Sequence, residues 1–279
     1  MNNSIYPCLW FDGQAKAAAD FYCSVFENSK ITATNPMVTA FELSGRKFIG
    51  LDGGPMFKVN PSISFFALCN SENEIEEKWQ KLSKDGVIMM TLNKYPWNEK
   101  YGWCQDQFGV NWQLMMGKMG NSPEKIIPSF MFTQSNAGKA ERAINFYTTV
   151  FKSSSIELIS RYEKGEHDVE GSIKHAQFAL ANQLFAAMDS SGPHAFIFNE
   201  GISFVVDCDT QEEIDYYWNK LTEEGQESQC GWLKDKFGVS WQIVPTVLTK
   251  LMSDPSKSER VIQAFMKMKK FDIAKLMNA

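Results

Sequence analysis

The sequence lacks the features of a secreted or membrane-bound protein. No stretch of its 279 residues approaches the roughly 20 consecutive apolar residues that a membrane span needs. Residues 1–12 have neither the basic start nor the long apolar run of a signal peptide. The cysteines form no Cys-x-x-Cys pair and follow no regular spacing; they are Cys8, Cys23, Cys69, Cys104, Cys208 and Cys230. We therefore expect a cytoplasmic protein with reduced thiols and no membrane partner.

Positive charge is also scarce. The formal net charge is −5, and no basic face offsets it, which argues against nucleic acid as a partner. The cluster Lys267, Lys269 and Lys270 is more typical of a solvated helix face than of an anion site. Apolar residues, by contrast, are abundant: 44% of the chain is hydrophobic and 13% is aromatic. These fractions suffice for two packed cores, and a chain of this length is expected to form about two domains.

A pattern typical of one amphipathic helix occurs twice. Residues 15–26 (AKAAADFYCSVF) return as residues 140–151 (AERAINFYTTVF). Phe21 and Tyr22 belong to a stripe at i, i+3, i+4 and i+7, which is the apolar face of a helix packed on a core. The stripe recurs with an offset of 125 residues (146 − 21). Because longer segments match around it, we predict a duplicated domain.

Two further motifs repeat in the same order. Capping boxes that begin a helix stand at Ser71-x-x-Glu74 and Thr210-x-x-Glu213. The pattern Asp-x-Phe-Gly-Val-x-Trp-Gln occupies residues 106–113 and again residues 235–242. The offset is 139 residues for the capping boxes (210 − 71) and 129 for the octapeptide (235 − 106). The changing offset places the differences in length in loops between elements.

Turn signals and hydrophobic patterns divide each copy into the order strand, helix, three strands, taken twice. A loop with Pro96 and Trp97 is expected in copy one before its last hairpin, which begins at Gly102. We predict an α+β protein with a first domain at 1–117, a polar linker at 118–125, a second domain at 126–248 and a helical tail at 249–279.

Four segments carry a resemblance to a known family: 7–13 (PCLWFDG), 53–58 (GGPMFK), 230–235 (CGWLKD) and 260–270 (RVIQAFMKMKK). Together with the tandem βαβββ units, they resemble the glyoxalase/bleomycin-resistance, or vicinal oxygen chelate, superfamily over nearly the whole chain. They are most similar to its PhnB-like proteins, often labelled 3-demethylubiquinone-9 3-methyltransferase domains. The resemblance implies two tandem vicinal-oxygen-chelate domains, each a pair of βαβββ units that forms a curved mixed sheet around a cavity, followed by the C-terminal helical tail.

The resemblance also implies where metal ligands would stand. Metal-using members place a His on the first strand, a Glu on the last strand, and a His or Glu in the other half. The corresponding residues here are Pro7 and Pro128, then Gln113 and Gln242, then Ser62 and Gly201. None is a usual metal ligand. The histidines, His167, His175 and His194, all lie in copy two outside these positions. We therefore expect no metal and no cofactor.

Aromatic and amide side chains remain as candidates for ligand binding. The geometry that the resemblance implies turns the two glutamines toward the cavity and the neighbouring tryptophans toward the helices. Each tryptophan could instead belong to a core, and each glutamine could be hydrogen-bonded structurally. Cys230 has no His or helix N-terminus near it that would lower the pKa of its thiol. The candidate ligand-binding residues are Trp10, Trp103, Gln113, Trp232, Gln242 and Cys230.

Two classes of function stay open. One is a PhnB-like protein that binds a small organic molecule in an aromatic-lined cavity without a metal. The other is a metal-dependent lyase, isomerase or dioxygenase of the same superfamily. The methyltransferase activity in the family label is not expected, because a methyl-donor nucleotide normally needs a Gly-rich turn from strand to helix. The turn at residues 52–55 (DGGP) is followed by strand-like sequence. The family also makes a homodimer possible.

The two cavities are expected to have diverged. Copy one has Tyr101 where copy two has Cys230, and ten extra residues precede it, including Pro96 and Trp97. An aromatic loop of that length can cover or fill a cavity. We expect at most one cavity to bind ligand well, with copy two favoured.

Overall fold

A computed structural model describes residues 3–120, 123–254 and 256–279. The chain divides into two compact units. Unit 1 comprises residues 1–6 and 203–279, and unit 2 comprises residues 7–202. Within the expected linker, Asn121 and Ser122 lie outside the described residues. No helix of the described ranges is long and apolar enough to cross a membrane.

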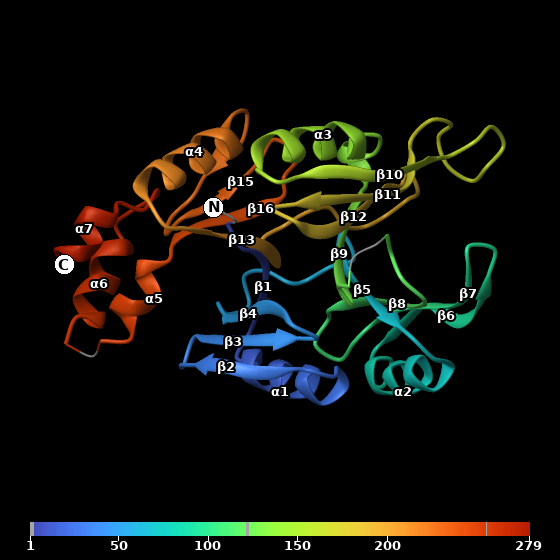
Figure 1. Ribbon diagram of the computed structural model, residues 1–279, viewed down its shortest axis with the longest axis horizontal. Helices are drawn as coiled ribbons and strands as arrows, with labels where there is room; N and C mark the ends of the chain where they lie inside the picture. Colours follow the sequence, from blue (N-terminus) through green and yellow to red (C-terminus); the bar gives the residue numbers. More distant parts are fainter. Residues whose placement is uncertain (1–2, 121–122, 255) are drawn as a thin grey trace. The chain divides into compact units, whose positions relative to one another are not determined.

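Copy one follows the expected order of elements, labelled in Figure 1. They are β1 (Ile5–Phe11), α1 (Ala15–Val25), β2 (Lys30–Thr34), β3 (Val38–Leu43), β4 (Arg46–Asp52), β5 (Ile63–Cys69), α2 (Glu72–Leu82), β6 (Val87–Tyr95), β7 (Asn98–Gln105) and β8 (Asn111–Met116). Ser71 caps α2 as its sequence predicts, because its side chain accepts from the N–H of Glu74. The stretch before Gly102, expected to be a loop, is instead the hairpin β6–β7.

Copy two repeats this order, and a tail follows. The elements are β9 (Ile126–Phe132), η1 (Gln134–Asn136), α3 (Ala140–Val150), β10 (Ser155–Arg161), β11 (Ile173–Leu180), β12 (Gln183–Asp189), β13 (Ile202–Cys208), α4 (Gln211–Thr222), β14 (Gln226–Glu227), β15 (Trp232–Lys234) and β16 (Ser240–Pro245). The tail holds α5 (Val247–Met252), α6 (Ser258–Phe265) and α7 (Ile273–Met277). The predicted helical tail is therefore divided into short helices, and residues 266–272 separate α6 from α7.

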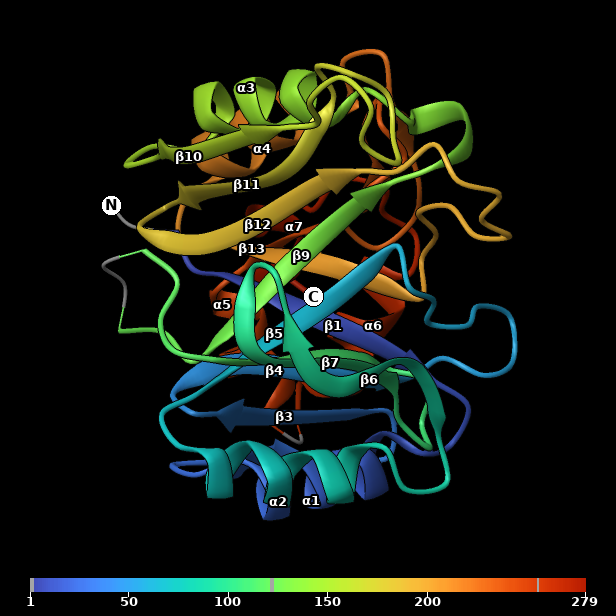
Figure 2. The same cartoon turned by 90° about the vertical axis from the view of Figure 1, so that its right-hand side faces the viewer.

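Unit 2 contains a mixed eight-stranded sheet in the order β10-β11-β12-β9-β5-β8-β7-β6, which Figure 2 shows from its open side. β5 pairs parallel with β8, and β9 with β12, while β5 and β9 are antiparallel neighbours. The first four strands of this order belong to copy two and the last four to copy one. The second βαβββ unit of copy one therefore shares a sheet with the first unit of copy two, so half-units are exchanged between copies. The predicted α+β class, with βαβββ units in tandem, is confirmed.

The opposite face of this sheet packs on an aromatic core. Trp112 of β8 is fully buried, with ring centroids 5.3 Å from Tyr22 and 4.8 Å from Phe26 at the end of α1. Phe65 of β5 lies 5.5 Å from the same tryptophan. The Phe-Tyr pair of the duplicated helix thus anchors the last strand, as the resemblance implied for the tryptophans. In Phe21-Tyr22, it is the tyrosine that is buried.

Unit 1 holds the strand order β14-β15-β16-β13, with β13 and β16 parallel. Its tail adds backbone contacts to the segment that enters β15, because the N–H groups of Cys230 and Gly231 donate to the carbonyls of Met268 and Lys269, both at 2.7 Å. A Cβ on Gly231 would come within 2.5 Å of the Phe271 ring. The tail is therefore fitted closely to the edge of this sheet.

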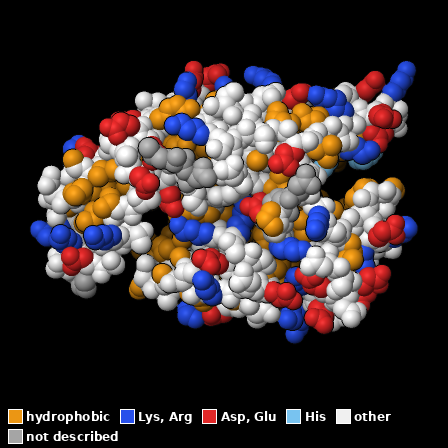
Figure 3. Space-filling view, viewed as in Figure 1, with side chains coloured by type: hydrophobic (Ala, Val, Ile, Leu, Met, Phe, Trp, Pro, Cys, Tyr) orange, Lys and Arg blue, Asp and Glu red, His pale blue; other side chains and the backbone are white. Residues whose placement is uncertain are grey.

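Ion pairs hold the same segment of the tail. Lys269 pairs with Glu227 at 3.3 Å, and Lys270 pairs with Asp215 at 2.5 Å. Two lysines of the basic cluster thus attach the tail instead of forming a purely solvated face. Hydrophobic side chains gather over α6 and α7 in Figure 3, where Ile262, Met266 and Met277 are exposed.

Candidate functional site

The repeated octapeptide forms the hairpin that leads into the last strand of each copy. In copy one, Asp106 Oδ1 accepts from the N–H groups of Phe108 and Val110 at 2.8 and 3.0 Å. Its Oδ2 accepts from Trp112 Nε1 at 2.8 Å. Burial raises the pKa of Asp106 to about 6, against these hydrogen bonds, which lower it. The aspartate therefore ties the turn to the core.

Copy two repeats this arrangement atom for atom. Asp235 accepts from the N–H groups of Phe237 and Val239 at 2.8 and 3.1 Å, and from Trp241 Nε1 at 2.9 Å. The Asp and Trp of the octapeptide are thus structural. The Gln that ends it, one residue after the buried tryptophan, must point to the opposite face of the sheet.

Gln113, the glutamine of copy one, is closed off from ligands. Its Nε2 donates to Ser64 Oγ at 2.7 Å, and its Oε1 accepts from the Tyr101 hydroxyl at 2.6 Å. The side chain is buried, with 4% of its surface exposed. Each polar atom of the amide has a partner within the protein, and burial of the side chain shields its remaining hydrogen-bonding capacity from a ligand.

The face around Gln113 is filled by apolar side chains. Tyr95 stacks on Trp97 at 5.0 Å, and both pack edge-on against Tyr101, at 5.7 and 5.8 Å between ring centroids. This aromatic group belongs to the β6–β7 hairpin, which crosses in front of β5 in Figure 2. The buried cluster beneath it consists of Phe66, Leu68, Tyr101, Met119, Ile127, Leu184 and Ala186.

Gln242, the glutamine of copy two, is held by one end. Its Nε2 donates to Ser203 Oγ at 2.9 Å, which matches the bond from Gln113 to Ser64. Among the residues that the structure describes, nothing takes the place of the Tyr101 hydroxyl at the carbonyl end of Gln242. The side chain is half-buried, and Trp232 lies opposite it on β15. An amide oxygen with spare accepting capacity therefore stands beside an aromatic ring.

Ser240 gives a second contrast at one variable position of the octapeptide. The corresponding residue of copy one, Asn111, accepts from Trp103 Nε1 at 3.3 Å and donates to the Gly109 carbonyl at 3.2 Å. Ser240 is buried, and its hydroxyl has no hydrogen-bond partner within the described ranges. It shares the Gln242 face of the sheet, opposite Lys234 of β15. An unpaired buried hydroxyl costs about 1–3 kcal/mol, which a ligand or a water molecule can recover.

The two copies also differ at three further equivalent positions near these glutamines. By the repeat offsets, the copy-one residues Phe66, Leu68 and Tyr101 correspond to Val205, Asp207 and Cys230 in copy two. The β13–β16 register places Val205 beside Gln242 and Asp207 beside Val244. Large apolar groups are thus replaced by smaller or charged ones. We refer to Ser203, Val205, Asp207, Trp232, Lys234, Ser240 and Gln242 as the Gln242 face.

The other tryptophan candidates have structural partners. Trp103 of β7 lies opposite Gln113 and takes part in the filled face of copy one. Trp10 Nε1 donates to the Gly54 carbonyl at 2.7 Å. A Cβ on Gly53 would come within 2.2 Å of the Trp10 ring, which explains why the sequence has glycine there. Trp10 thus packs on the loop that follows β4, with its ring centroid 5.0 Å from that of Phe57.

Cys230 lies at the start of the segment that enters β15. Its thiol is 3.8 Å from both the Phe265 carbonyl and Met266 Sδ. Burial raises the pKa of the thiol, so the thiolate is disfavoured at neutral pH. Of the six candidate residues, the structure therefore brings together Trp232 and Gln242 in unit 1, and Trp103 and Gln113 in unit 2.

Within the described residues, no three His, Cys, Asp or Glu side chains come close enough together to hold a metal ion. His175 contacts Gln177 at 3.1 Å, and burial lowers the pKa of its imidazole. His194 contacts Ser190 Oγ at 2.7 Å, and His167 packs on the Tyr162 ring at 5.1 Å.

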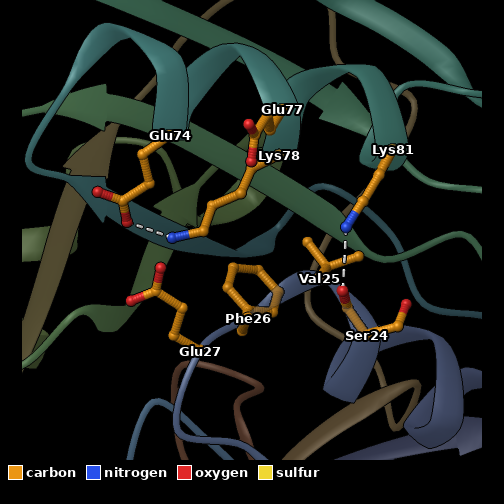
Figure 4. Close-up of a pocket in the computed structure, with 8 residues that line it drawn as sticks. All are labelled: Ser24, Val25, Phe26, Glu27, Glu74, Glu77, Lys78 and Lys81. Carbon is orange, nitrogen blue, oxygen red and sulfur yellow. Dashed lines mark hydrogen bonds and ion pairs between the residues drawn. The ribbon is translucent and has the colours of Figure 1, made fainter.

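A cavity of about 290 Å³ lies between the end of α1 and the face of α2 that is turned toward it (Figure 4). Its charged groups serve the fold: Lys78 pairs with Glu74, and Lys81 Nζ donates to the Ser24 carbonyl at 3.1 Å. None of the candidate residues lines this cavity, which is formed by Ser24, Val25, Phe26, Glu27, Glu74, Glu77, Lys78 and Lys81.

The tandem βαβββ units and the sheet that half-units of both copies share form a glyoxalase I-like fold. The sequence profile of the 3-demethylubiquinone-9 3-methyltransferase family matches residues 3–115 and again residues 124–244. Since the two matches cover most of the chain, the protein belongs to this family. The turn at Asp52-Gly53-Gly54-Pro55 is followed by β5 and not by a helix.

Two solved structures illustrate the relationship. The PhnB protein from Bacillus cereus is 33% identical over 40% of this chain and 98% of its own, with a TM-score of 0.38. Glyoxalase I from Zea mays is 12% identical over 90% of this chain and 96% of its own, with a TM-score of 0.57. The maize enzyme is thus similar in fold. No protein of curated function matches this chain.

Sequence reasoning missed Ser203, Ser240 and Asp207. Ser203 stands at the repeat offset of Ser64, and Ser240 replaces Asn111 inside the octapeptide. Comparing the variable positions of the repeats would have found them. The hydrogen bonds that distinguish paired from unpaired polar atoms required the structure.

Proposed function

We propose that this protein binds a small organic molecule on the Gln242 face of copy two. The observation that carries the proposal is the difference between two equivalent glutamines. Gln113 has both amide ends paired inside the protein, whereas Gln242 is paired through one end to Ser203. An amide that is half satisfied and half-buried is suited to orient a ligand that donates a hydrogen bond.

The neighbouring residues support the same assignment. Trp232 is an aromatic residue opposite Gln242, and Val205 is a smaller side chain than Phe66, its counterpart in copy one. Ser240 adds an unpaired hydroxyl. A mainly apolar surface with a few convergent polar groups is typical of small-molecule sites. Binding does not need a metal in this proposal, because the polar groups of the face supply the orientation themselves.

The test is a thermal-shift screen of small aromatic compounds, followed by titration of each hit against two matched variants. Gln242→Leu keeps roughly the side-chain volume and removes the amide. The loss of one hydrogen bond, about 0.5–1.5 kcal/mol, weakens binding roughly twofold to tenfold. Gln113→Leu is the control and is expected to leave the dissociation constant unchanged.

Melting temperatures of the free variants separate binding from folding, because Gln113 is also a buried structural group. Equal weakening of binding by both changes contradicts the proposal, and so does a second site of equal affinity. Elemental analysis of the purified protein tests the metal-free part. We expect well under one transition-metal ion per chain, and a stoichiometric metal would favour the lyase, isomerase or dioxygenase alternative.

A further inference from the structure

One edge of the unit 2 sheet is apolar and open to solvent. The strand order ends at β6, so no other strand of the described residues pairs with its outer side. Val87, Ile88 and Met89 are 54%, 52% and 42% exposed. Because successive side chains of a strand point to opposite faces, both faces of β6 are exposed here. The register shift between Ile88 and Met90 also leaves Met89 without a partner on β7.

The strand β10 forms the other edge of the same sheet and differs from β6 in charge. It too exposes two apolar side chains, Ile156 and Leu158. Glu157 stands between them, and Arg161 ends the strand. Charged side chains on an edge strand oppose its pairing with another chain. In β6, by contrast, residues 87–93 carry no charge, and an uncharged apolar edge of this length is a template for a further strand.

The charges near the two ends of β6 favour a second copy of the chain as the partner. Asp85 lies four positions before Met89, and Lys94 lies four positions after Met90. In an antiparallel pair of two β6 strands centred between these methionines, Asp85 of each copy therefore approaches Lys94 of the other. Both residues are exposed. Lys94 pairs with Glu99 in the single chain, but an exposed ion pair of this kind contributes little and is readily exchanged.

The same register matches the apolar residues. It places Val87 opposite Leu92, and Ile88 opposite Thr91, of the second copy. The two methionines at the centre, Met89 and Met90, then face each other across the axis. Cross-strand pairs of this kind are the main stabilising contacts of an antiparallel sheet, and Thr91 is the only polar member among them.

We propose that two copies of this protein associate through β6, edge to edge and antiparallel, about a twofold axis between Met89 and Met90. The sheet of unit 2 then continues from one copy into the other. This dimerisation does not depend on ligand binding at the Gln242 face. Because two edge strands bury little surface compared with an obligate dimer, the dissociation constant is expected in the micromolar range.

Analytical ultracentrifugation of the full chain at micromolar concentrations measures the association. Ile88→Lys places a charge on the open edge without removing a buried group, and it is expected to weaken dimerisation at least tenfold. Ile156→Lys makes the same change on β10, where the native residue is similarly exposed, and is expected to leave the dissociation constant unchanged. Melting temperatures check that both variants are folded.

A double-mutant cycle tests the antiparallel register. Asp85→Asn and Lys94→Gln each remove both ion pairs between the copies, so each is expected to weaken dimerisation about twofold to tenfold. The double variant is expected to dimerise as well as either single variant, because the same ion pairs are lost. Asparagine suits position 85, since it tolerates the positive φ of Asp85, 56°.

A chain that stays monomeric throughout the concentration range contradicts the proposal. A dimer that Ile88→Lys leaves intact, or that both lysine variants weaken equally, contradicts it as well. If neither Asp85→Asn nor Lys94→Gln weakens the dimer, or if their effects simply add, the two residues do not meet and the proposed pairing is wrong.

Discussion

Strands β8 and β16 carry the same octapeptide framework, and their two glutamines donate to equivalent serines. Their surroundings nevertheless differ. The Tyr101 hydroxyl donates a hydrogen bond to the side-chain carbonyl of Gln113. Cys230 stands at the same repeat position before β16, but its thiol contacts the Phe265 carbonyl of the tail instead. The comparison shows that the repeats share the structural part of the motif and differ in the residues that could meet a ligand.

The segments that cover the two strand edges explain this divergence. In copy one, β6 pairs with β7, with Asn93 opposite Tyr101. In copy two, the backbone of Cys230 and Gly231 is instead paired by Met268 and Lys269 of the tail. Both solutions satisfy backbone groups at a sheet edge. The hairpin of copy one also brings Tyr95 and Trp97 against Tyr101, and it thereby fills the face.

The largest expected effect comes from the part that the two copies share. Asp106→Ala leaves the buried Trp112 indole N–H and two backbone N–H groups without their acceptor. We expect a loss of about 3 kcal/mol in the free energy of unfolding, since each buried unpaired donor costs about 1–3 kcal/mol. Chemical denaturation measures it. Asp235→Ala is expected to cost a similar amount, and a much smaller loss in either copy would break the structural equivalence.

The second effect comes from exchanging the residues that differ. Tyr101→Cys removes a buried ring and is expected to cost about 2–4 kcal/mol by analogy with other large-to-small core changes. It also frees the carbonyl of Gln113. A second site for an aromatic compound found in the thermal-shift screen is therefore expected in this variant. Isothermal titration counts the sites, and an unchanged count would show that the β6–β7 hairpin alone closes copy one.

A smaller effect concerns pH. The raised pKa of Asp106, about 6 in the folded state against an ordinary 3.8, means that the folded protein binds this proton more tightly than the unfolded chain. Its contribution to stability is thus present below about pH 4 and is lost as the pH rises to about 6. Asp106→Asn cannot titrate. The difference in unfolding free energy between native protein and variant should change across this window and be flat above pH 7.

The smallest effect tests the predicted domain boundary. Limited proteolysis is expected to cut first between Gly117 and Lys125. Because β5 of copy one and β9 of copy two are paired in one sheet, the two fragments should stay associated without denaturant. Size-exclusion chromatography and denaturing gels together report this outcome. A first cut within residues 62–85 would contradict the boundary, and dissociation of the fragments would contradict the shared sheet.

The sequence by itself determined the duplication, the order of elements and the family. Periodicity located the helices at Ala15–Val25 and Ala140–Val150, and the octapeptide located the last strands, because local patterns determine local structure. The hairpin before Gly102 was missed. The pairing of β6 with β7 has several register shifts, so β6 lacks the strict alternation that identifies a strand.

Only the tertiary structure decided which half-units share a sheet and which polar atoms stay unpaired. Pairing of β5 with β9 joins residues about 60 positions apart, and no local pattern specifies it. The octapeptide made Gln113 and Gln242 look equivalent. Their difference arises from a hydroxyl twelve residues before Gln113 and its absence at Cys230. The capacity of a side chain to meet a ligand depends on what surrounding segments leave unsatisfied, and that is a property of packing.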